Sequence, residues 1–232
     1  MKIAYFQNSS LMDFPNHISP IIFTFGCNLR CGFCHNKELV LPENNNKIDE
    51  IDFNKILEYI KKNLKMINGV TFTGGEPLLN NDLIEYIKPL KALNLDIKLD
   101  TNGSLPIQLK KIIDSNMIDY IAMDLKSDSN NYKKICGIDL YNKQLESIEI
   151  FEKSNIKGEY RLTCFSDDIK FYKKIFNLIK STKKTLYLQQ FLNKETLDPD
   201  FKKIPNTSLK LLNELKEIAN SYNINTEIRK YF

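Results

Sequence analysis

Short apolar segments rich in β-branched and aromatic residues alternate along this chain with longer segments whose apolar residues recur at helical spacing. The short segments predict strands at 19–25, 69–73, 96–100, 119–124, 158–164 and 185–191. The longer segments predict helices at 52–64, 81–93, 106–115, 144–154, 168–180 and 208–222. Strands that alternate with helices form a parallel sheet, because each helix carries the chain back to the start of the next strand. We therefore predict an α/β fold with six parallel strands and outer helices, wound right-handedly.

Nothing in the sequence divides the chain into separate domains. It has no internal repeat and no Gly/Ser-rich linker, and the asparagine-rich stretch at 43–47 reads as a surface loop. The last residues, 225–232, are expected to form an edge strand. We predict a single domain over residues 1–232, made of a leader at 1–18, a core at 19–191 and a C-terminal helix and tail at 192–232.

The composition is that of an ordinary globular protein, with 42% hydrophobic and 27% charged residues. The net charge is +4 and the lysines are scattered, which favours solvated helix faces over a nucleic-acid-binding stripe. No apolar run approaches the roughly 20 residues that span a bilayer, and the N-terminus lacks the apolar stretch of a signal peptide. We therefore expect a cytoplasmic protein with no nucleic-acid or membrane partner, whose five cysteines are ligands or buried thiols.

Polar residues and cysteines stand where the predicted strands end. Three cysteines follow the first strand, TGGEP follows the second, DTNG the third and MDLK the fourth. The fifth strand contains Arg161, and the sixth ends with Gln189 and Gln190. Because parallel α/β folds bind ligands at the carboxyl ends of their strands, we predict the functional site at this rim.

The loop after the first strand is opened by Gly26 and carries Cys27, Cys31 and Cys34. One interpretation is a structural zinc site, which would need a fourth ligand. His35 is poorly placed for that role because it is adjacent to Cys34, and Cys136 and Cys164 lie far along the chain. The other interpretation is an iron–sulfur cluster, in which three thiolates leave one iron open to a substrate. The spacing alone leaves both interpretations standing.

The motifs around these cysteines resemble those of a known superfamily. The spacing Cys-x3-Cys-x2-Cys, with Phe33 before the third cysteine, and the GGEP at 74–77 resemble the radical S-adenosylmethionine (SAM) superfamily. The segments CHN at 34–36, LDTNG at 99–103 and MDLK at 123–126 resemble its glycyl-radical-enzyme activases. The leader resembles the branch that activates anaerobic ribonucleotide reductase, although Asn16 stands where that branch usually has glycine. The sixth strand lacks the histidine of the pyruvate formate-lyase activators, which disfavours that assignment.

This resemblance implies a partial (β/α)6 barrel of the radical SAM type and two cofactors, a [4Fe–4S] cluster and SAM. It implies that the cluster ligands are Cys27, Cys31 and Cys34. It implies that the SAM contacts are Phe33, Asn36, Gly74, Gly75, Glu76, Asp100, Asn102, Asp124, Lys126 and Arg161. No catalytic residue beyond these ligands is expected. A monovalent cation is a further implied ligand, held by Asp100, Thr101 and Asp124.

Within this set, Glu76 would accept a hydrogen bond from the ammonium of SAM, and Arg161 would contact its ribose or its carboxylate. Asp100, Asp124 and Lys126 would surround the carboxylate end of SAM. Carboxylates that converge there would repel one another, so either a cation or Lys126 must offset them. Cys136 and Cys164 are expected to be buried thiols rather than ligands of an auxiliary cluster, and His35 is given only a supporting role.

The resemblance implies an enzyme that reductively cleaves SAM and generates a glycyl radical on a large partner, anaerobic ribonucleoside-triphosphate reductase. A flavodoxin or ferredoxin would supply the electron. Three alternatives remain open: activation of another glycyl radical enzyme such as pyruvate formate-lyase, a radical SAM reaction on a small molecule or nucleotide, and a non-enzymatic zinc-bound interaction module.

Overall fold

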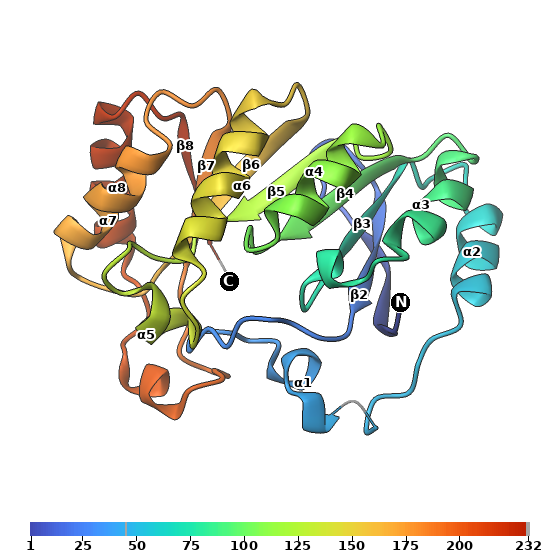
Figure 1. Ribbon diagram of the computed structural model, residues 1–232, viewed down its shortest axis with the longest axis horizontal. Coiled ribbons are helices and arrows are strands. Elements are labelled where there is room, and N and C mark those ends of the chain that lie inside the picture. The colour runs from blue at the N-terminus through green and yellow to red at the C-terminus, as the bar shows by residue number, and fades with distance from the viewer. Residues whose placement is uncertain (45, 231–232) are drawn as a thin grey trace. The chain divides into compact units, whose positions relative to one another are not determined.

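The computed structural model describes residues 1–44 and 46–230, and within them eight strands form one sheet in chain order, from β1 to β8 (Figure 1). The strands are β1 (Ile3–Ser10), β2 (Ser19–Thr24), β3 (Gly69–Gly74), β4 (Asp96–Thr101), β5 (Tyr120–Asp124), β6 (Lys157–Cys164), β7 (Thr185–Gln190) and β8 (Thr226–Arg229). β1 pairs with β2 in antiparallel fashion. The pairs β2–β3, β3–β4, β6–β7 and β7–β8 are parallel. The predicted fold class, α/β with a parallel sheet, is confirmed.

The six predicted strands are present as β2 to β7, and each differs from its predicted range by one residue at one end. β8 forms within the expected edge strand at 225–232, of which residues 231 and 232 lie outside the described residues. β1 was not predicted, and it makes part of the leader at 1–18 a strand of the sheet. Among the strand pairings given above, only that of β1 with β2 is antiparallel.

The helices follow the predicted alternation. They are α1 (Lys37–Val40), α2 (Phe53–Lys62), α3 (Leu83–Lys91), α4 (Pro106–Asp114), α5 (Tyr132–Cys136), α6 (Tyr141–Lys153), α7 (Ile169–Leu178) and α8 (Leu209–Ser221), with short 3-10 turns η1 (Pro42–Asn44), η2 (Pro77–Leu79) and η3 (Pro199–Lys203). Six of the helices were predicted, whereas the short helices α1 and α5 were not. Among the described residues, no helix combines the length and the apolar character needed to cross a membrane.

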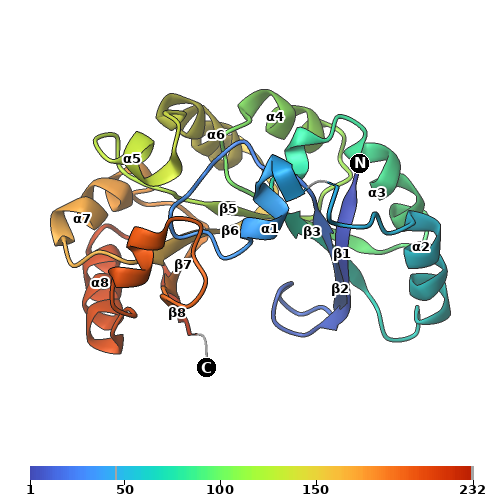
Figure 2. The ribbon, with the colours of Figure 1, turned by 90° about the horizontal axis from the view of Figure 1, so that it is seen from below.

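The chain divides into two compact units. The first comprises Met1–Asn28, Glu38–Thr101 and Ile107–Ile121, and it contains β1 to β4, α2, α3 and most of α4. Helices α2, α3 and α4 lie on one side of its strands (Figure 2). Fully buried side chains of the parallel strands form its core, namely Ile22, Val70, Phe72, Ile97 and Leu99. Nearly every residue of β3 and β4 is buried, because little of either face of these strands meets solvent.

The second unit comprises Leu29–Lys37, Asn102–Pro106 and Ala122–Phe232, and it contains β6 to β8 and α5 to α8. α8 packs against α7, β7 and β8. Side-chain caps start two of its helices: Asp168 accepts a hydrogen bond from the Lys170 N–H at α7, and Ser208 accepts one from the Leu211 N–H at α8. The prediction of a single domain over the whole chain stays a prediction.

Candidate functional site

In the first unit, the ends of β2 and β3 approach each other so closely that only glycine fits between them. The Gly75 N–H donates to the Thr24 carbonyl at 2.9 Å, and the Glu76 N–H donates to the Gly26 carbonyl at 2.8 Å. A Cβ atom on Gly75 would lie 1.9 Å from the Gly26 carbonyl oxygen. Gly74 has a φ of +112°, and a Cβ there would lie 2.5 Å from the Thr24 backbone nitrogen. The two glycines are therefore needed to seat the GGEP turn against the chain just before Cys27.

Glu76 is a fully buried carboxylate at the start of η2. Its Oε1 atom accepts hydrogen bonds from the Leu78 N–H at 3.1 Å and from the Thr101 hydroxyl at 2.9 Å. Both donors are neutral, so these two hydrogen bonds stabilise the carboxylate without cancelling its charge. Such a group favours a cationic partner.

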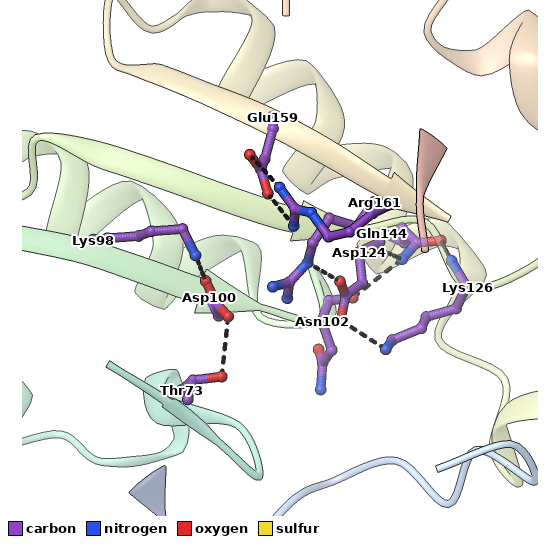
Figure 3. A network of polar contacts seen from close by, with 10 residues as sticks. Thr73, Lys98, Asp100, Asn102, Asp124, Lys126, Gln144, Glu159 and Arg161 are labelled. Atoms are coloured by element: carbon purple, nitrogen blue, oxygen red, sulfur yellow. Dashed lines mark hydrogen bonds and ion pairs between the residues drawn. The ribbon is translucent and has the colours of Figure 1, made fainter. Parts of the chain in front are cut away.

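Asp100, near the end of β4, forms a second acidic group in the first unit (Figure 3). Its Oδ2 atom accepts a hydrogen bond from the Thr73 hydroxyl at 3.0 Å, and its Oδ1 atom forms an ion pair with the Lys98 ammonium. Lys98 stands two residues earlier on the same strand, so its side chain leaves the same face of the sheet. Lys98 was missed in the sequence, although a lysine in a predicted strand of a buried parallel sheet is itself a signal of a buried partner.

In the second unit, the loop with Cys31 and Cys34 is held by the end of helix α5. The N–H groups of Arg30 and Gly32 donate to the carbonyls of Cys136 and Ile135, at 2.8 and 2.9 Å. These carbonyls belong to the last turn of a helix, where they lack partners within the helix itself. Helix α5 thus fixes the backbone on both sides of Cys31.

The two thiols of this loop have different environments. A hydrogen bond with Cys136 lowers the pKa of Cys31 to about 7, against the opposing effect of burial, and Lys126 adds to the lowering. Burial raises the pKa of Cys34, although the Asn36 backbone N–H and Lys126 act in the opposite direction. The proximity of Cys136 to Cys31 was not predicted, because α5 is too short to give a periodic signal. Cys136 and Cys164 are both buried, as expected.

Aromatic rings support the same loop. The Phe33 ring stacks on Phe165 with 5.2 Å between centroids and meets the edge of Phe201 at 6.2 Å. A Cβ on Gly32 would lie 2.2 Å from an atom of the Phe201 ring, so this ring packs directly on the loop backbone. The Lys126 ammonium lies 5.6 Å from the Phe33 ring centroid, within the range of a cation–π interaction. Phe33 therefore links the cysteine loop to the charged residues that follow β5.

Those charged residues form a three-membered cluster around Asp124 (Figure 3). Asp124 pairs with the Lys126 ammonium at 2.9 Å and with the Arg161 Nε atom, contributed by β6, at 2.7 Å. Burial acts to raise the pKa of Asp124, but Arg161 and Lys126 outweigh it and hold that pKa below its usual value. Burial acts to lower the pKa of Lys126, but Asp124 and Cys31 outweigh it and raise that pKa. The cluster therefore contains two cations and one anion.

Gln144 of α6 holds the backbone beneath this cluster. It is fully buried, its Nε2 atom donates to the carbonyls of Asn102 and Asp124 at 3.1 and 2.9 Å, and its Oε1 atom accepts from the Lys126 N–H at 3.3 Å. The Asn102 side chain closes its own turn by accepting from the Ser104 N–H at 2.9 Å. Gln144 was not found in the sequence, where a buried glutamine on an amphipathic helix cannot be told from an exposed one.

The predicted site residues thus fall into two groups. The first unit holds Cys27, Gly74, Gly75, Glu76, Asp100 and Thr101. The second holds Cys31, Phe33, Cys34, Asn36, Asn102, Asp124, Lys126 and Arg161. His35 is exposed, with its ring centroid 6.3 Å from that of Phe191. Gln190 donates to the Thr207 carbonyl at 2.9 Å, which gives it a structural role. The cluster and SAM contacts assigned to these residues stay predictions.

Residues 21–179 match the family model of the Radical SAM superfamily. This chain therefore belongs to that superfamily. Over 228 residues it is 33% identical to a Methanocaldococcus jannaschii protein provisionally named a glycyl-radical enzyme activating enzyme, a match that covers 95% of this chain and 92% of that one. Over 131 residues it is 34% identical to a Saccharolobus islandicus protein provisionally named GTP 3′,8-cyclase. This match covers 56% of this chain and 41% of that one.

A solved structure shares the fold at low sequence identity. A radical SAM methyltransferase from Sphaerobacter thermophilus superposes with a TM-score of 0.74 at 12% identity, over 94% of this chain and 68% of that one. Members of this superfamily are enzymes that use a [4Fe–4S] cluster and SAM. Membership removes the support for the zinc-bound interaction module, and the described residues contain no group of three His, Cys, Asp or Glu placed to bind a single metal ion.

The residues present fit both cofactors. Cys27, Cys31 and Cys34 are free thiols, the donors that iron–sulfur clusters take, and apolar side chains such as Phe33 and Leu29 are buried in their loop. SAM carries an ammonium and a carboxylate at its amino-acid end. The carboxylate of Glu76 is suited to the former, and the cationic excess around Asp124 is suited to the latter.

Proposed function

We propose that this chain activates a glycyl radical enzyme, anaerobic ribonucleoside-triphosphate reductase, by reductive cleavage of SAM. Cys27, Cys31 and Cys34 hold the cluster. The observation that carries the proposal is the 33% identity to a provisionally named glycyl-radical enzyme activating enzyme, because it extends over nearly the full length of both chains. The CHN, LDTNG and MDLK motifs support the same assignment.

The charges around Glu76 and those around Asp124 each support the predicted roles of these residues as SAM contacts. Among the groups described, Lys98, Asp100 and Glu76 sum to one negative charge in the first unit. Asp124, Lys126 and Arg161 sum to one positive charge in the second. An amino acid is a zwitterion, so one excess charge of each sign matches it. In this proposal Glu76 binds the ammonium and the Lys126–Arg161 pair binds the carboxylate.

The remaining predicted contacts have positioning roles in this proposal. Gly74 and Gly75 set the turn that presents Glu76, Asn102 closes the turn after β4, and the Asn36 backbone N–H forms a hydrogen bond with Cys34. Held by Cys27, Cys31 and Cys34, the cluster would supply one electron for the reductive cleavage of SAM, and this chemistry would allow a hydrogen atom to be removed from a glycine Cα of the partner enzyme. The chain's own residues bind and orient SAM and keep water from it. A flavodoxin or ferredoxin is the proposed electron donor.

The leader supports the ribonucleotide reductase branch despite its departure from the usual sequence. Asn16 occupies the position where glycine is usual, and its φ is +63°. Asparagine is among the few residues with a side chain that adopt this left-handed region readily. The substitution therefore keeps the turn that glycine would make.

The test is anaerobic reconstitution of the cluster, followed by electron paramagnetic resonance with SAM, reductant and anaerobic ribonucleotide reductase. We expect an organic radical whose main hydrogen splitting collapses when the reductase carries deuterated glycine, because the remaining α-hydrogen produces that splitting. The matched control is a reductase in which the radical-bearing glycine is replaced by alanine, which should give no signal. Absence of the radical from the unsubstituted reductase, with an intact cluster and SAM bound, would contradict the assignment of the partner. Pyruvate formate-lyase in place of the reductase tests the related alternative.

A second candidate function is a reaction on a nucleotide, and the 34% identity to a provisionally named GTP 3′,8-cyclase favours it. That match leaves out more than half of the longer protein, so it supports a shared cofactor chemistry more than a shared substrate. The two candidates differ in what accelerates SAM cleavage. Stimulation by GTP, with a modified nucleotide as product and no protein radical, would favour the second.

A further inference from the structure

Helix α5 places a second buried thiol beside the loop that carries Cys31. Cys136 ends this helix and is fully buried, and Cys31 is also buried. The N–H groups on either side of Cys31 donate to the carbonyls of Cys136 and Ile135, at 2.8 and 2.9 Å. After the helix, a Cβ atom on Gly137 would lie 2.8 Å from the Cβ of Arg30. The end of α5 is therefore fixed tightly against the backbone around Cys31, and both segments belong to the second unit.

The side chains of these two cysteines meet within this backbone frame. The Cys136 thiol donates a hydrogen bond to the Cys31 sulfur. Because both residues are buried, water does not compete for this hydrogen bond. The proposed function makes the Cys31 sulfur a cluster ligand, and a thiolate is a charged acceptor, to which hydrogen bonds are stronger than to a neutral one. Cys136 is therefore placed to act on the cluster through Cys31 without being a ligand itself.

From this geometry we infer that Cys136 is a positioning residue that raises the reduction potential of the cluster through its hydrogen bond to Cys31. Reduction adds one electron to the cluster, and part of the added negative charge resides on the cysteine sulfurs. A donor to one of these sulfurs stabilises the reduced form more than the oxidised form. The cluster is then easier for the electron donor of the proposed function to reduce. The inference rests on the proposed ligation of the cluster by Cys31.

The experiment is a redox titration of the cluster-reconstituted full chain with dithionite, in the absence of SAM and of any partner enzyme. Electron paramagnetic resonance measures the amount of reduced cluster at each potential, and iron and sulfide content measure cluster loading. Cys136→Ala removes the donor and should keep the full iron content. We expect the ratio of reduced to oxidised cluster at a fixed potential to fall about threefold or more in this variant. That corresponds to a reduction potential about 30 mV lower, because a tenfold change is about 59 mV for one electron.

Two further variants make the result specific. Cys136→Ser keeps a hydroxyl donor at the same position and should restore most of the lost potential. Cys164→Ala removes another fully buried thiol of the same unit, whose sulfur donates to the Leu162 carbonyl at 3.5 Å. Because that acceptor is a backbone carbonyl rather than a proposed ligand, Cys164→Ala should leave the potential of the cluster unchanged.

A fully loaded Cys136→Ala protein with the potential of the natural chain would overturn the inference. Equal shifts in Cys136→Ala and Cys136→Ser would also overturn it, because they would assign the effect to packing of the sulfur. If Cys136→Ala does not hold the cluster, Cys136→Ser decides: a cluster retained there shows that the donor is needed, whereas loss from both variants overturns the inference. A natural chain that binds no cluster would instead contradict the proposed function, and this inference with it, so the two failures are distinguishable.

Discussion

Asp100 and Asp124 both lie at the carboxyl ends of strands, and each pairs with a lysine two residues away in the sequence, yet their surroundings differ. Lys98 precedes Asp100 and is buried within β4, so the pair is closed and has no net charge. Lys126 follows Asp124 and comes after the end of β5, and Arg161 of β6 adds a second cation. In the first arrangement Lys98 neutralises the Asp100 carboxylate. In the second, the Asp124 carboxylate holds two cations, Lys126 and Arg161, in place.

This difference shows that a carboxylate at a strand end does not by itself define a ligand contact. Asp100 is satisfied by Lys98 and Thr73, which makes it a structural support for the first unit. Asp124 instead fixes the positions of Lys126 and Arg161, whose summed charge exceeds its own. In the proposed function, the anionic end of SAM is therefore bound by the cations around Asp124, and neither aspartate needs to contact it.

The largest expected effect is on the thiolates of the proposed cluster. Replacing Cys31 by alanine should abolish the cluster and with it all SAM cleavage, because the cluster loses one of its three proposed thiolate ligands. Iron and sulfide content after anaerobic reconstitution measures the effect. The matched control is Cys164→Ala, which removes a fully buried thiol of the same unit and should keep four irons. A Cys31→Ala protein with four irons and full activity would refute the ligand assignment.

A smaller but still large effect is expected at the backbone contact that presents Glu76 in the first unit. Gly75→Ala should lower the free energy of unfolding by about 3 kcal/mol or more, because its Cβ would lie 1.9 Å from the Gly26 carbonyl oxygen. Gly26→Ala is the control, since no atom lies within 4 Å of its Cβ and only its φ of +94° is unfavourable. That variant should lose only about 1–2 kcal/mol. Equal losses, measured by denaturant unfolding, would show that the close approach is not the constraint.

The pH dependence of stability tests whether the ion pairs of Asp124 stabilise the fold. The pKa of Asp124 is lowered in the folded chain, so its ion pairs stabilise the fold above the unfolded-state pKa of about 4. This stabilisation is lost as the pH falls through the lower, folded-state pKa. The natural chain should exceed Asp124→Asn in unfolding free energy by about 2 kcal/mol at pH 6, and the difference should shrink towards pH 3.

The control for this measurement is Asp200→Asn, which removes an exposed pair with Lys203 and should change little at any pH, because exposed ion pairs contribute little. A difference between the natural chain and Asp124→Asn that grows on acidification would mean that the ion pairs of Asp124 do not stabilise the fold.

Much of the fold could be predicted because the parallel strands β2 to β7 are short apolar runs bounded by helical patterns. β1 escaped because Ile3–Ser10 is an edge strand in which Tyr5 is more than half exposed, so it lacks a clean alternation. Helix α5 escaped because five residues cannot establish a helical period. Its loss mattered, since α5 fixes the loop that carries Cys31.

The predicted site residues were chosen by motif, and motifs do not reveal their neutralising partners. Lys98 stands inside the predicted strand at 96–100, and no motif marked it as half of an ion pair with Asp100. The GGEP motif also does not reveal why glycine is needed at position 75. The structure shows that Gly75 packs against the backbone of Gly26. Contacts between residues far apart in the sequence, such as that of Arg161 with Asp124, depend on the order of the strands in the sheet. The sequence next to either residue does not reveal them.

The most direct test of the comparison is the affinity of the cluster-loaded chain for SAM and for decarboxylated SAM, with and without Lys126. Lys126→Met should weaken SAM binding about 10-fold or more, because a charge pair typically contributes at least 1.5 kcal/mol. It should leave the affinity for decarboxylated SAM unchanged, since that ligand has no carboxylate for the ammonium to bind. Lys174→Met, which removes a half-exposed partner of Asp128, should alter neither affinity. If Lys126→Met weakened both ligands equally, the cations around Asp124 would not bind the carboxylate of SAM, and the account would be contradicted.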